Sequence, residues 1–389
     1  MMRRKHYLGW MLAALFSVAS VPDAAHAAEE SKIPTLSQVL DASGVNLSGF
    51  IDTSATYNWN GTPNFTSGTS SRAYDVQPNS FNVQMMELAL TKEPTEGLGG
   101  VLVLNAGPDA NVDASYGTSS TNEFDFQQAY VSYTTGGAKL ILGKFSTLIG
   151  AEVIESPQNW NFSRSWGFEL GPYTHTGARL TYAPTDKIGF TIGVNNGWDI
   201  FKAAGRKQKS LEAQVNYTPA DSVYLSLQAT SGSEPAQGGY AAAGTIYGNR
   251  TLVNTVDSWD VNDKVSLMVD AGYGTQKKAI SLAAGAPATA KTVKWWYITP
   301  YLNYHITSQW RIALRGQYFD DKDGFRTGVA QKLKAGTFTL AYAPSGTNSE
   351  IRAEYRYDKS NVKAFNSTKG NALPKNSQSS AALEFIYTM

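Results

Sequence analysis

The sequence predicts an all-β protein: a transmembrane, antiparallel, up-and-down β-barrel of about 16 strands, with about 14 or 18 also allowed by the pattern. Segments of about ten residues alternate between apolar and polar side chains, and short and long connections take turns between them. The last segment, 380–389, alternates in the same way and carries Phe385 and Tyr387 on one face. We therefore expect the chain to close a sheet on itself, as outer-membrane barrels do.

The first residues read as a targeting segment. Arg3, Arg4 and Lys5 precede an apolar run at 7–21, and Ala25-His26-Ala27 supplies the small-x-small pattern that signal peptidase cleaves. We expect residues 1–27 to be a cleaved signal peptide. A transmembrane anchor is the alternative, but a spanning helix needs about 20 apolar residues, and neither this run nor any later stretch reaches that length.

Residues 28–44 form an N-terminal segment ahead of the barrel, which we place in the periplasm. Leu36, Val39 and Leu40 have helical spacing, Thr35 is a candidate N-cap and Gly44 a candidate stop. The pattern predicts a short amphipathic helix over 35–42, lying in the periplasmic mouth of the barrel or between protomers. Disorder is the alternative for a terminal segment this short.

Residues 45–389 carry the strands of the barrel, and 46–59 is the clearest strand, with apolar residues on one face and polar residues on the other. Short links are predicted at 135–137, 184–187, 219–222, 261–264, 307–309 and 344–347. Long polar loops are predicted at 60–80, 108–123, 150–172, 199–209, 232–250, 274–294, 320–330 and 359–376. Bacterial barrels have tight periplasmic turns on one rim and long extracellular loops on the other, so these loops imply about 16 strands.

Two segments depart from a simple alternation. The segment 81–91 shifts its phase at Met85-Met86, which predicts a β-bulge. The apolar run at 101–104 has no polar face, which predicts that the barrel interior is tightly packed there. Both segments remain compatible with strands.

The polar phase of each strand should face the barrel lumen. Ionised groups are tolerated there, whereas Arg or Lys on the lipid face at mid-depth costs about 2 to 4 kcal/mol. The pore-lining candidates are Asp52, Lys144, His175, Arg179, Glu212, Arg311, Arg315, Arg352, Glu354 and Arg356. These charges fit either a water-filled channel or an internal salt-bridge network that braces or plugs the barrel; at about 16 strands a channel is expected.

The loop at 150–172 mixes aromatic residues with Glu and Arg, which suits packing against other protein surface. Bent into the lumen, it would narrow the pore, with Glu152, Glu155 and Arg164 as constriction charges. An ordinary packed outer loop is the alternative. In the first case, a charged constriction would set Lys144 and the wall arginines against Asp52, Glu152, Glu155, Glu212 and Glu354.

Composition supports a membrane barrel. The chain has 21 Tyr, 9 Trp and 16 Phe, and amphipathic rings gather at the two membrane interfaces. The candidates for these aromatic girdles are Tyr57, Trp59, Tyr133, Tyr182, Tyr217, Tyr273, Trp296, Trp310, Tyr342 and Tyr387. A net charge of +1 argues against a nucleic-acid partner.

Several strings of residues, spread over the whole mature chain, resemble the OmpL-like β-barrel porins, also called β-barrel porin family 2. They are Leu40-Asp41-Ala42-Ser43-Gly44, Gly49-Phe50-Ile51-Asp52-Thr53, Gln127-Gln128-Ala129-Tyr130-Val131-Ser132-Tyr133, Gly143-Lys144-Phe145, Asn159-Trp160-Asn161-Phe162-Ser163-Arg164-Ser165, Pro172-Tyr173-Thr174-His175-Thr176-Gly177, Asn196-Gly197-Trp198-Asp199 and Tyr318-Phe319-Asp320-Asp321-Lys322-Asp323-Gly324-Phe325-Arg326. The resemblance implies an outer-membrane pore and brings no substrate or catalytic residue with it. Met389 departs from the terminal Phe or Trp that is usual in barrels, so recognition by the assembly machinery would rest on Phe385 and Tyr387.

Other functions have weaker support. A hydrolase needs a base, and His175 is the histidine of the mature chain that lies on the lumen-facing phase of a strand. The sequence offers it neither a nucleophile elbow nor a clear acidic partner. We therefore expect no catalytic residue and no enzyme. Asp320, Asp321 and Asp323 resemble the start of a calcium loop but lack the bidentate Glu at its end, so we expect no metal site and no cofactor. Surface cation binding that bridges lipopolysaccharide is the alternative at these residues. The strongest rival is a non-conducting structural or adhesive barrel that acts through its extracellular loops.

The sequence therefore predicts a porin of the Gram-negative outer membrane that passes small hydrophilic solutes or ions through a water-filled, charge-lined channel. Its expected partners are outer-membrane lipid and lipopolysaccharide, the barrel-assembly machinery and, by analogy with barrels of this size, two further copies in a homotrimer.

Overall fold

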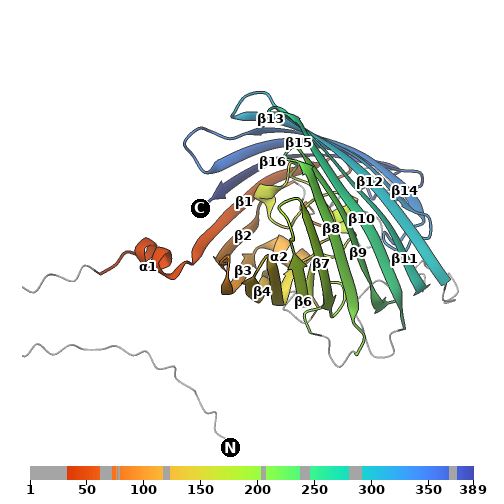
Figure 1. Ribbon diagram of the computed structural model, residues 1–389. Coiled ribbons are helices and arrows are strands. Elements are labelled where there is room, and N and C mark those ends of the chain that lie inside the picture. The colour runs from red at the N-terminus through yellow and green to blue at the C-terminus, as the bar shows by residue number, and fades with distance from the viewer. Residues whose placement is uncertain are drawn as a thin grey trace, which may run out of the picture.

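The computed structural model describes residues 33–61, 72–75, 77, 79–116, 123–202, 207–236, 246–279, 291–367 and 375–389. The expected signal peptide lies outside these ranges. The described residues form one closed barrel of sixteen antiparallel strands, in which each strand pairs with its sequence neighbours and β1 pairs with β16 (Figure 1). The predicted fold class and strand count are confirmed.

The strands are β1 (Asn46–Asn58), β2 (Ser80–Lys92), β3 (Gly97–Ala106), β4 (Phe124–Thr135), β5 (Ala138–Ser146), β6 (Thr174–Tyr182), β7 (Ile188–Asn195), β8 (Ser210–Ala220), β9 (Val223–Pro235), β10 (Tyr247–Asn262), β11 (Val265–Ala279), β12 (Lys291–His305), β13 (Trp310–Asp321), β14 (Gln331–Tyr342), β15 (Ser349–Ser360) and β16 (Ser377–Thr388). The helices are α1 (Leu36–Ser43), α2 (Pro108–Asp113) and α3 (Trp166–Glu169), with a 3-10 turn η1 at Ser156–Gln158. None of the described helices is long and apolar enough to cross a bilayer.

The short helix predicted ahead of the barrel is present as α1. The Thr35 side chain caps its first turn, and Gly44 ends it in the left-handed conformation at φ 66°. A side chain rarely adopts this backbone angle, so glycine is the residue that stops the helix here. In Figure 1, α1 projects from the barrel beyond the start of β1, and Leu36 and Val39 are exposed.

Side chains alternate along each strand, so that charged side chains face the barrel interior and aromatic side chains face outward. On β15, Arg352, Glu354 and Arg356 are buried inside the barrel, whereas Tyr355 and Tyr357 are exposed on the outer face. The predicted girdle residues are exposed as well, except that Tyr342 is half-buried because its ring stacks on Trp310 at 4.5 Å. The outer face is thus apolar and aromatic, as lipid contact requires.

Both predicted irregularities are confirmed. Asp52 pairs with Met85 and Thr53 with Val83, so Gln84 is an extra residue, and it and Met85 are both buried. On β3, Val101 and Val103 are buried in a small apolar cluster with Ala89. The bulge matters for the site, because it adds a polar side chain to the interior.

Two predicted loop ranges were wrong in extent. The range 232–250 contains the end of β9 and the start of β10, and 274–294 contains the end of β11 and the start of β12. These strand ends are polar but still paired: Arg250 Nε donates to Gln276 Oε1 at 2.8 Å. A strand that continues above the membrane loses its apolar face, so polarity alone does not separate it from a loop. The short link at residues 93–96, between β2 and β3, was missed.

The lumen is not an empty cylinder in the described residues. Trp166, Trp198, Trp295 and Phe319 belong to one buried apolar cluster inside the barrel. Phe50, Met85, Ile154, Phe168 and Tyr173 belong to a second such cluster. Residues from several long loops take part in both clusters, so the loops fold inward onto the barrel wall.

Candidate functional site

The connection between β5 and β6, residues 147–173, lies inside the barrel; we call it loop 3. At its start, the Gly150 amide donates to Asn254 Oδ1 at 3.0 Å and the Ala151 amide to Asp270 Oδ2 at 3.2 Å. Asn254 lies on β10 and Asp270 on β11, so loop 3 crosses the lumen from its own strands to this wall. An ordinary outer loop would not reach these inward side chains.

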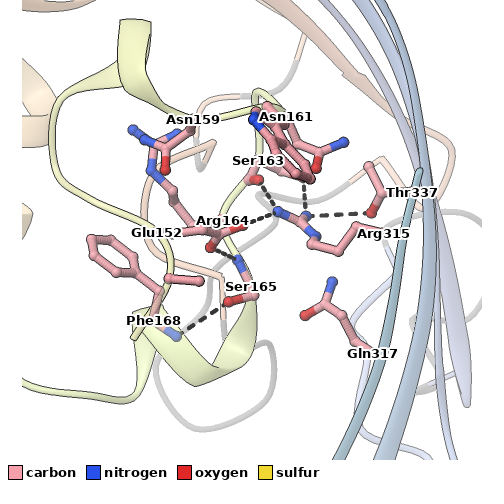
Figure 2. Close-up of polar contacts among 12 residues, drawn as sticks. Glu152, Asn159, Asn161, Ser163, Arg164, Ser165, Phe168, Arg315, Gln317 and Thr337 are labelled. Atoms are coloured by element: carbon pink, nitrogen blue, oxygen red, sulfur yellow. Dashed lines mark hydrogen bonds and ion pairs between the residues drawn. The ribbon is translucent and has the colours of Figure 1, made fainter. Parts of the chain in front are cut away.

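Arg315 on β13 holds the middle of loop 3. Its Nη1 is 2.6 Å from Glu152 Oε1 and also donates to the Ser163 carbonyl, while Nη2 donates to Ser163 Oγ at 2.9 Å (Figure 2). Glu152 Oε2 in turn accepts the Ser165 amide at 2.5 Å. Since both charged side chains are buried, each depends on the other for its partner.

Glu354 on β15 supports the same stretch from the side. Its two carboxylate oxygens accept the backbone amides of Phe162 at 2.8 Å and Ser163 at 3.1 Å, and Oε2 also accepts the Thr339 hydroxyl at 2.8 Å. Two successive amides can share one carboxylate because the charge makes these hydrogen bonds strong. Glu354 therefore fixes the position of the loop backbone.

The other wall arginines also contact loop 3. Arg352 donates to the Ser156 carbonyl at 3.1 Å, Arg311 to the Trp160 carbonyl at 2.8 Å and Arg356 to the Arg164 carbonyl at 2.6 Å. Each also pairs with a carboxylate of the wall: Glu384 at 3.2 Å, Glu350 at 2.6 Å and Asp358 at 2.8 Å, respectively. Four of the five arginines predicted to line the pore, all except Arg179, are thus bonded to loop 3.

The three charges predicted within loop 3 have different surroundings. Glu152 pairs with the wall, and Glu155 accepts a hydrogen bond from Gln127 Nε2 of β4 at 2.6 Å. Arg164 turns back on its own loop and donates to the carbonyls of Phe162 at 2.8 Å and Ile154 at 2.9 Å. Arg164 therefore organises the loop from within.

The remaining candidates lie on other strands. Arg179 and Glu212, on β6 and β8, form a two-pronged ion pair at 2.7 and 3.0 Å. Lys144 Nζ is 2.7 Å from Asp125 Oδ2, with both side chains buried. His175 lies between the Gly197 carbonyl at 3.2 Å and Thr147 Oγ1 at 3.3 Å. Asp52 lies on β1 near Glu384.

Sequence reasoning missed several buried charges in the loops. Arg72, from the loop after β1, pairs with Asp75 and lies 3.2 Å from Asp358. Burial lowers its pKa to about 10. Glu169 at the end of α3 is buried, which raises its pKa to about 8 although Arg356 and Arg72 oppose the shift. From sequence, charged residues in a long loop are predicted to be exposed to water. Their burial follows from the inward fold of the loops, which the sequence pattern does not show.

No group of three or more His, Cys, Asp or Glu side chains in the described ranges is arranged to hold a metal ion. Asp321 instead accepts the amides of Phe325 at 3.0 Å, Arg326 at 2.9 Å and Thr327 at 2.7 Å. The acidic stretch that resembled a calcium loop is a turn in which the Asp321 carboxylate accepts backbone amides of the residues that follow it.

Comparison with known proteins gives both a family and structural neighbours. Residues 44–389 match the family described as Putative beta-barrel porin-2, OmpL-like. No curated protein matches the chain. Among solved structures, the outer membrane channel DcaP of Acinetobacter baumannii is similar, with TM-score 0.59 and 15% identity over 89% of this chain and 97% of that one.

Two further structures show the same fold. The trimer form of OmpT of Vibrio cholerae has TM-score 0.58 and 12% identity over 89% of this chain and 99% of that one. The anion-selective porin of Comamonas acidovorans has TM-score 0.58 and 13% identity over the same fractions. The chain therefore belongs to the OmpL-like β-barrel porin-2 family and is an outer-membrane porin of a Gram-negative bacterium.

Proposed function

We propose that small hydrophilic solutes or ions diffuse through the lumen of this porin and that loop 3 sets the width of the passage. The observation that supports this most is the row of wall residues Arg311, Arg315, Arg352, Glu354 and Arg356, all of which hold loop 3 inside the barrel. A loop anchored by buried, charge-assisted hydrogen bonds keeps one position, so it can act as a sieve.

The proposed lining of the passage follows from this arrangement. Arg315 pairs with Glu152 of loop 3, and the other arginines of β13 and β15 that contact loop 3 pair with carboxylates of the wall, so each of these charges has an acidic partner. Lys144, Arg179 and Glu212 lie on β5, β6 and β8, away from β13 and β15, whose side chains hold the middle of loop 3, whereas Asp52 on β1 and His175 on β6 contact loop 3 through Ser156 and Thr147. We assign the polar side chains of these strands to the solute path, with the exposed part of loop 3 opposite them.

The assembly we propose is a homotrimer in the outer membrane. OmpT of Vibrio cholerae, which shares the fold, has been solved in a trimer form. The apolar outer face, with its aromatic girdles, suits contact with lipid and lipopolysaccharide, and insertion would depend on the barrel-assembly machinery. Cross-linking of the detergent-folded barrel, read on a denaturing gel, tests the trimer; a monomer at all protein concentrations would overturn it.

One observation favours a second function, a non-conducting structural or adhesive barrel. The two buried apolar clusters fill part of the lumen with side chains from the wall and from the long loops. If these loops close the passage completely, the barrel would act through its surface alone.

Planar-bilayer recording of the refolded mature barrel separates the two functions. Stable conductance steps that decrease when uncharged polymers of increasing size are added would support a sieve and give its width. A folded, heat-resistant barrel that inserts but conducts no ions at any voltage would support the structural or adhesive function instead.

A further inference from the structure

Lysine side chains gather on the outside of the barrel, at the extracellular ends of β11, β12, β14 and β15. The strands β11 and β12 each have 15 residues, whereas a strand needs about 9 to 11 to cross the membrane. Their polar ends, beside the long loop that joins them, therefore extend past the hydrocarbon layer on the extracellular side. We call the outward lysines of this region the basic face: Lys277, Lys294, Lys332, Lys334 and Lys359.

The alternation along the strands places the basic face outside the lumen. On β12, Trp295 is buried in the interior, so its neighbour Lys294 faces outward. On β14, the exposed side chains of Lys332 and Lys334 flank the buried Leu333. The basic face therefore points away from the solute path, and its charges require another explanation.

Two of these lysines are direct cross-strand neighbours. Lys334 on β14 is paired in register with Lys359 on β15. Opposite residues on one face have their Cβ atoms about 5 Å apart, and like charges at such positions repel each other. Among the described residues, neither lysine forms an ion pair; Lys334 lies over the Tyr318 ring at 6.0 Å, and Asp320 on β13 is 3.5 Å from Lys332 instead. The pair is thus complementary to an anion that contacts both ammonium groups.

The outer face carries no side chains at two adjoining positions just below the lysine pair. Gly316 on β13 and Gly336 on β14 are paired in register, and Gly336 is two residues from Lys334 toward the membrane. A Cβ added at Gly336 would meet no atom within 4 Å, and one at Gly316 would meet Pro300 Cγ at 3.4 Å. Tyr357, the partner of Gly336 on β15, is exposed beside them. A sugar ring or an acyl chain can therefore approach the backbone here.

We propose that the basic face binds the phosphate groups of lipid A, the acylated and phosphorylated sugar that anchors lipopolysaccharide in the outer leaflet. Residues rise about 3.4 Å along a strand, so Lys334 lies about 7 Å beyond Gly336. That step matches the change from acyl chains to a phosphorylated headgroup. Lysine binds phosphate as a point charge, and clusters of lysines bind anionic lipid surfaces. Because Phe338 continues the apolar face below, the surface favours this lipid over a free phosphate ion, which would gain nothing from apolar contacts.

The inference rests on the proposed contact with lipopolysaccharide and gives that contact a place on the barrel. Next to the basic face, the outward ends of β9 and β10 carry Ser233 and Asn249, which are paired in register and uncharged. The lysines are therefore not a uniform ring around the extracellular rim. Lipid A should bind preferentially to the side of the barrel formed by β11 to β15.

The test measures how much lipid A the folded mature barrel retains in detergent, by native mass spectrometry. Diphosphoryl lipid A is compared with the same lipid after removal of its phosphates. We expect the diphosphoryl form to bind at least tenfold more tightly, with EDTA present. Equal binding of the two lipids would overturn the proposal. Loss of binding in EDTA would replace the direct lysine contacts with a bridging divalent cation, and displacement by inorganic phosphate would indicate a site for soluble anions; either result would overturn the assignment.

The variants locate the site. Each lysine near an anionic headgroup contributes roughly a factor of five in affinity, so Lys334→Gln with Lys359→Gln should weaken binding at least tenfold. Lys187→Gln with Lys264→Gln, in exposed short turns, removes the same charge and is the matched control. Lys334→Arg with Lys359→Arg keeps the charge and should bind like the wild type. Folding of each variant is verified by heat-modifiable gel mobility. Unchanged binding in the folded Lys334→Gln, Lys359→Gln variant would contradict the site.

Conductance separates this inference from the proposed function. In bilayers of phospholipid alone, the variants of the basic face should show the same conductance steps as the wild type, because these lysines lie outside the lumen. Conductance without retention of lipid A would support the sieve and reject the basic face as a lipid site. Retention of lipid A by a barrel that carries no current would support the basic face and overturn the porin mechanism.

Discussion

Arg315 and Glu152 lie 163 positions apart in the chain and form a buried ion pair, with 2.6 Å between Nη1 and Oε1. Arg315 is on β13 and Glu152 at the start of loop 3, so the pair joins the barrel wall to the loop across the lumen. Neither side chain has access to water that could replace the partner. The position of loop 3 therefore depends on this contact more than on any exposed charge.

Arg315→Ala should release the middle of loop 3 and raise the single-channel conductance. Removing one member of a buried ion pair costs about 3 to 5 kcal/mol, because the other charge stays buried and unpaired. The expected result is a larger conductance step and passage of larger uncharged polymers, measured in planar bilayers. Lys139→Met is the control, since its ion pair with Glu93 is partly exposed. A shift in ion selectivity with unchanged conductance would instead place Arg315 in the pore lining.

Glu354→Ala should make loop 3 mobile without moving it permanently. The substitution removes the acceptor for the amides of Phe162 and Ser163, each a hydrogen bond to a charged group worth about 1.5 to 3 kcal/mol. We expect flickering of the open-channel current and faster amide exchange in loop 3. Glu354→Gln keeps one acceptor oxygen and should flicker less. Steady current in the alanine variant would show that Glu354 does not position the loop.

The packing of α3 should weaken as the pH rises. Burial raises the pKa of Glu169 from its ordinary 4.5 to about 8, so between these values the folded state binds the proton and the unfolded state does not. Stability gained from the neutral group is complete below pH 4.5 and is lost progressively up to about pH 8. The check is amide exchange of loop 3 at pH 5 and pH 9. Glu169→Gln should reduce the difference, and an equal difference in that variant would exclude Glu169 as its cause.

The barrel fold could be predicted from the sequence because contact with lipid requires apolar and polar side chains to alternate along each strand. Arg352, Glu354 and Arg356 alternate with exposed apolar or aromatic residues, and that pattern alone orients β15. It could not show that these side chains contact loop 3, since a charge facing water and one bonded to a loop look the same in sequence. The contacts join positions nearly 200 residues apart, such as Arg352 and Ser156.

The loops were the least predictable part for the same reason. Residues 150–172 stood out because aromatic side chains accompany Glu and Arg, and the structure indeed packs them inside the barrel. The helix α2 gave no such signal, although its Asp109 and Asp113 are buried in the lumen. Acidic residues near Pro and Asn are typical of solvated turns. Only tertiary packing distinguishes the buried case.

Gly167→Ala should displace α3 from the wall and narrow the passage. A Cβ at this position would lie 2.5 Å from Cε2 of Tyr297 on β12, closer than packed carbon atoms allow. Tyr297 is itself buried and stacks on Phe319 with 6.0 Å between the ring centroids, so the ring cannot easily move away. Overpacking of this kind costs about 1 to 3 kcal/mol, and shifting the four-residue helix α3 is the easier relief. Because the wall lies behind α3, the helix can move only toward the lumen. We therefore expect a lower unfolding temperature and a smaller conductance step.

Gly336→Ala on β14 is the matched control, because no atom lies within 4 Å of its added Cβ. If both variants conduct like the wild type, the contact between α3 and Tyr297 does not determine the width of the passage.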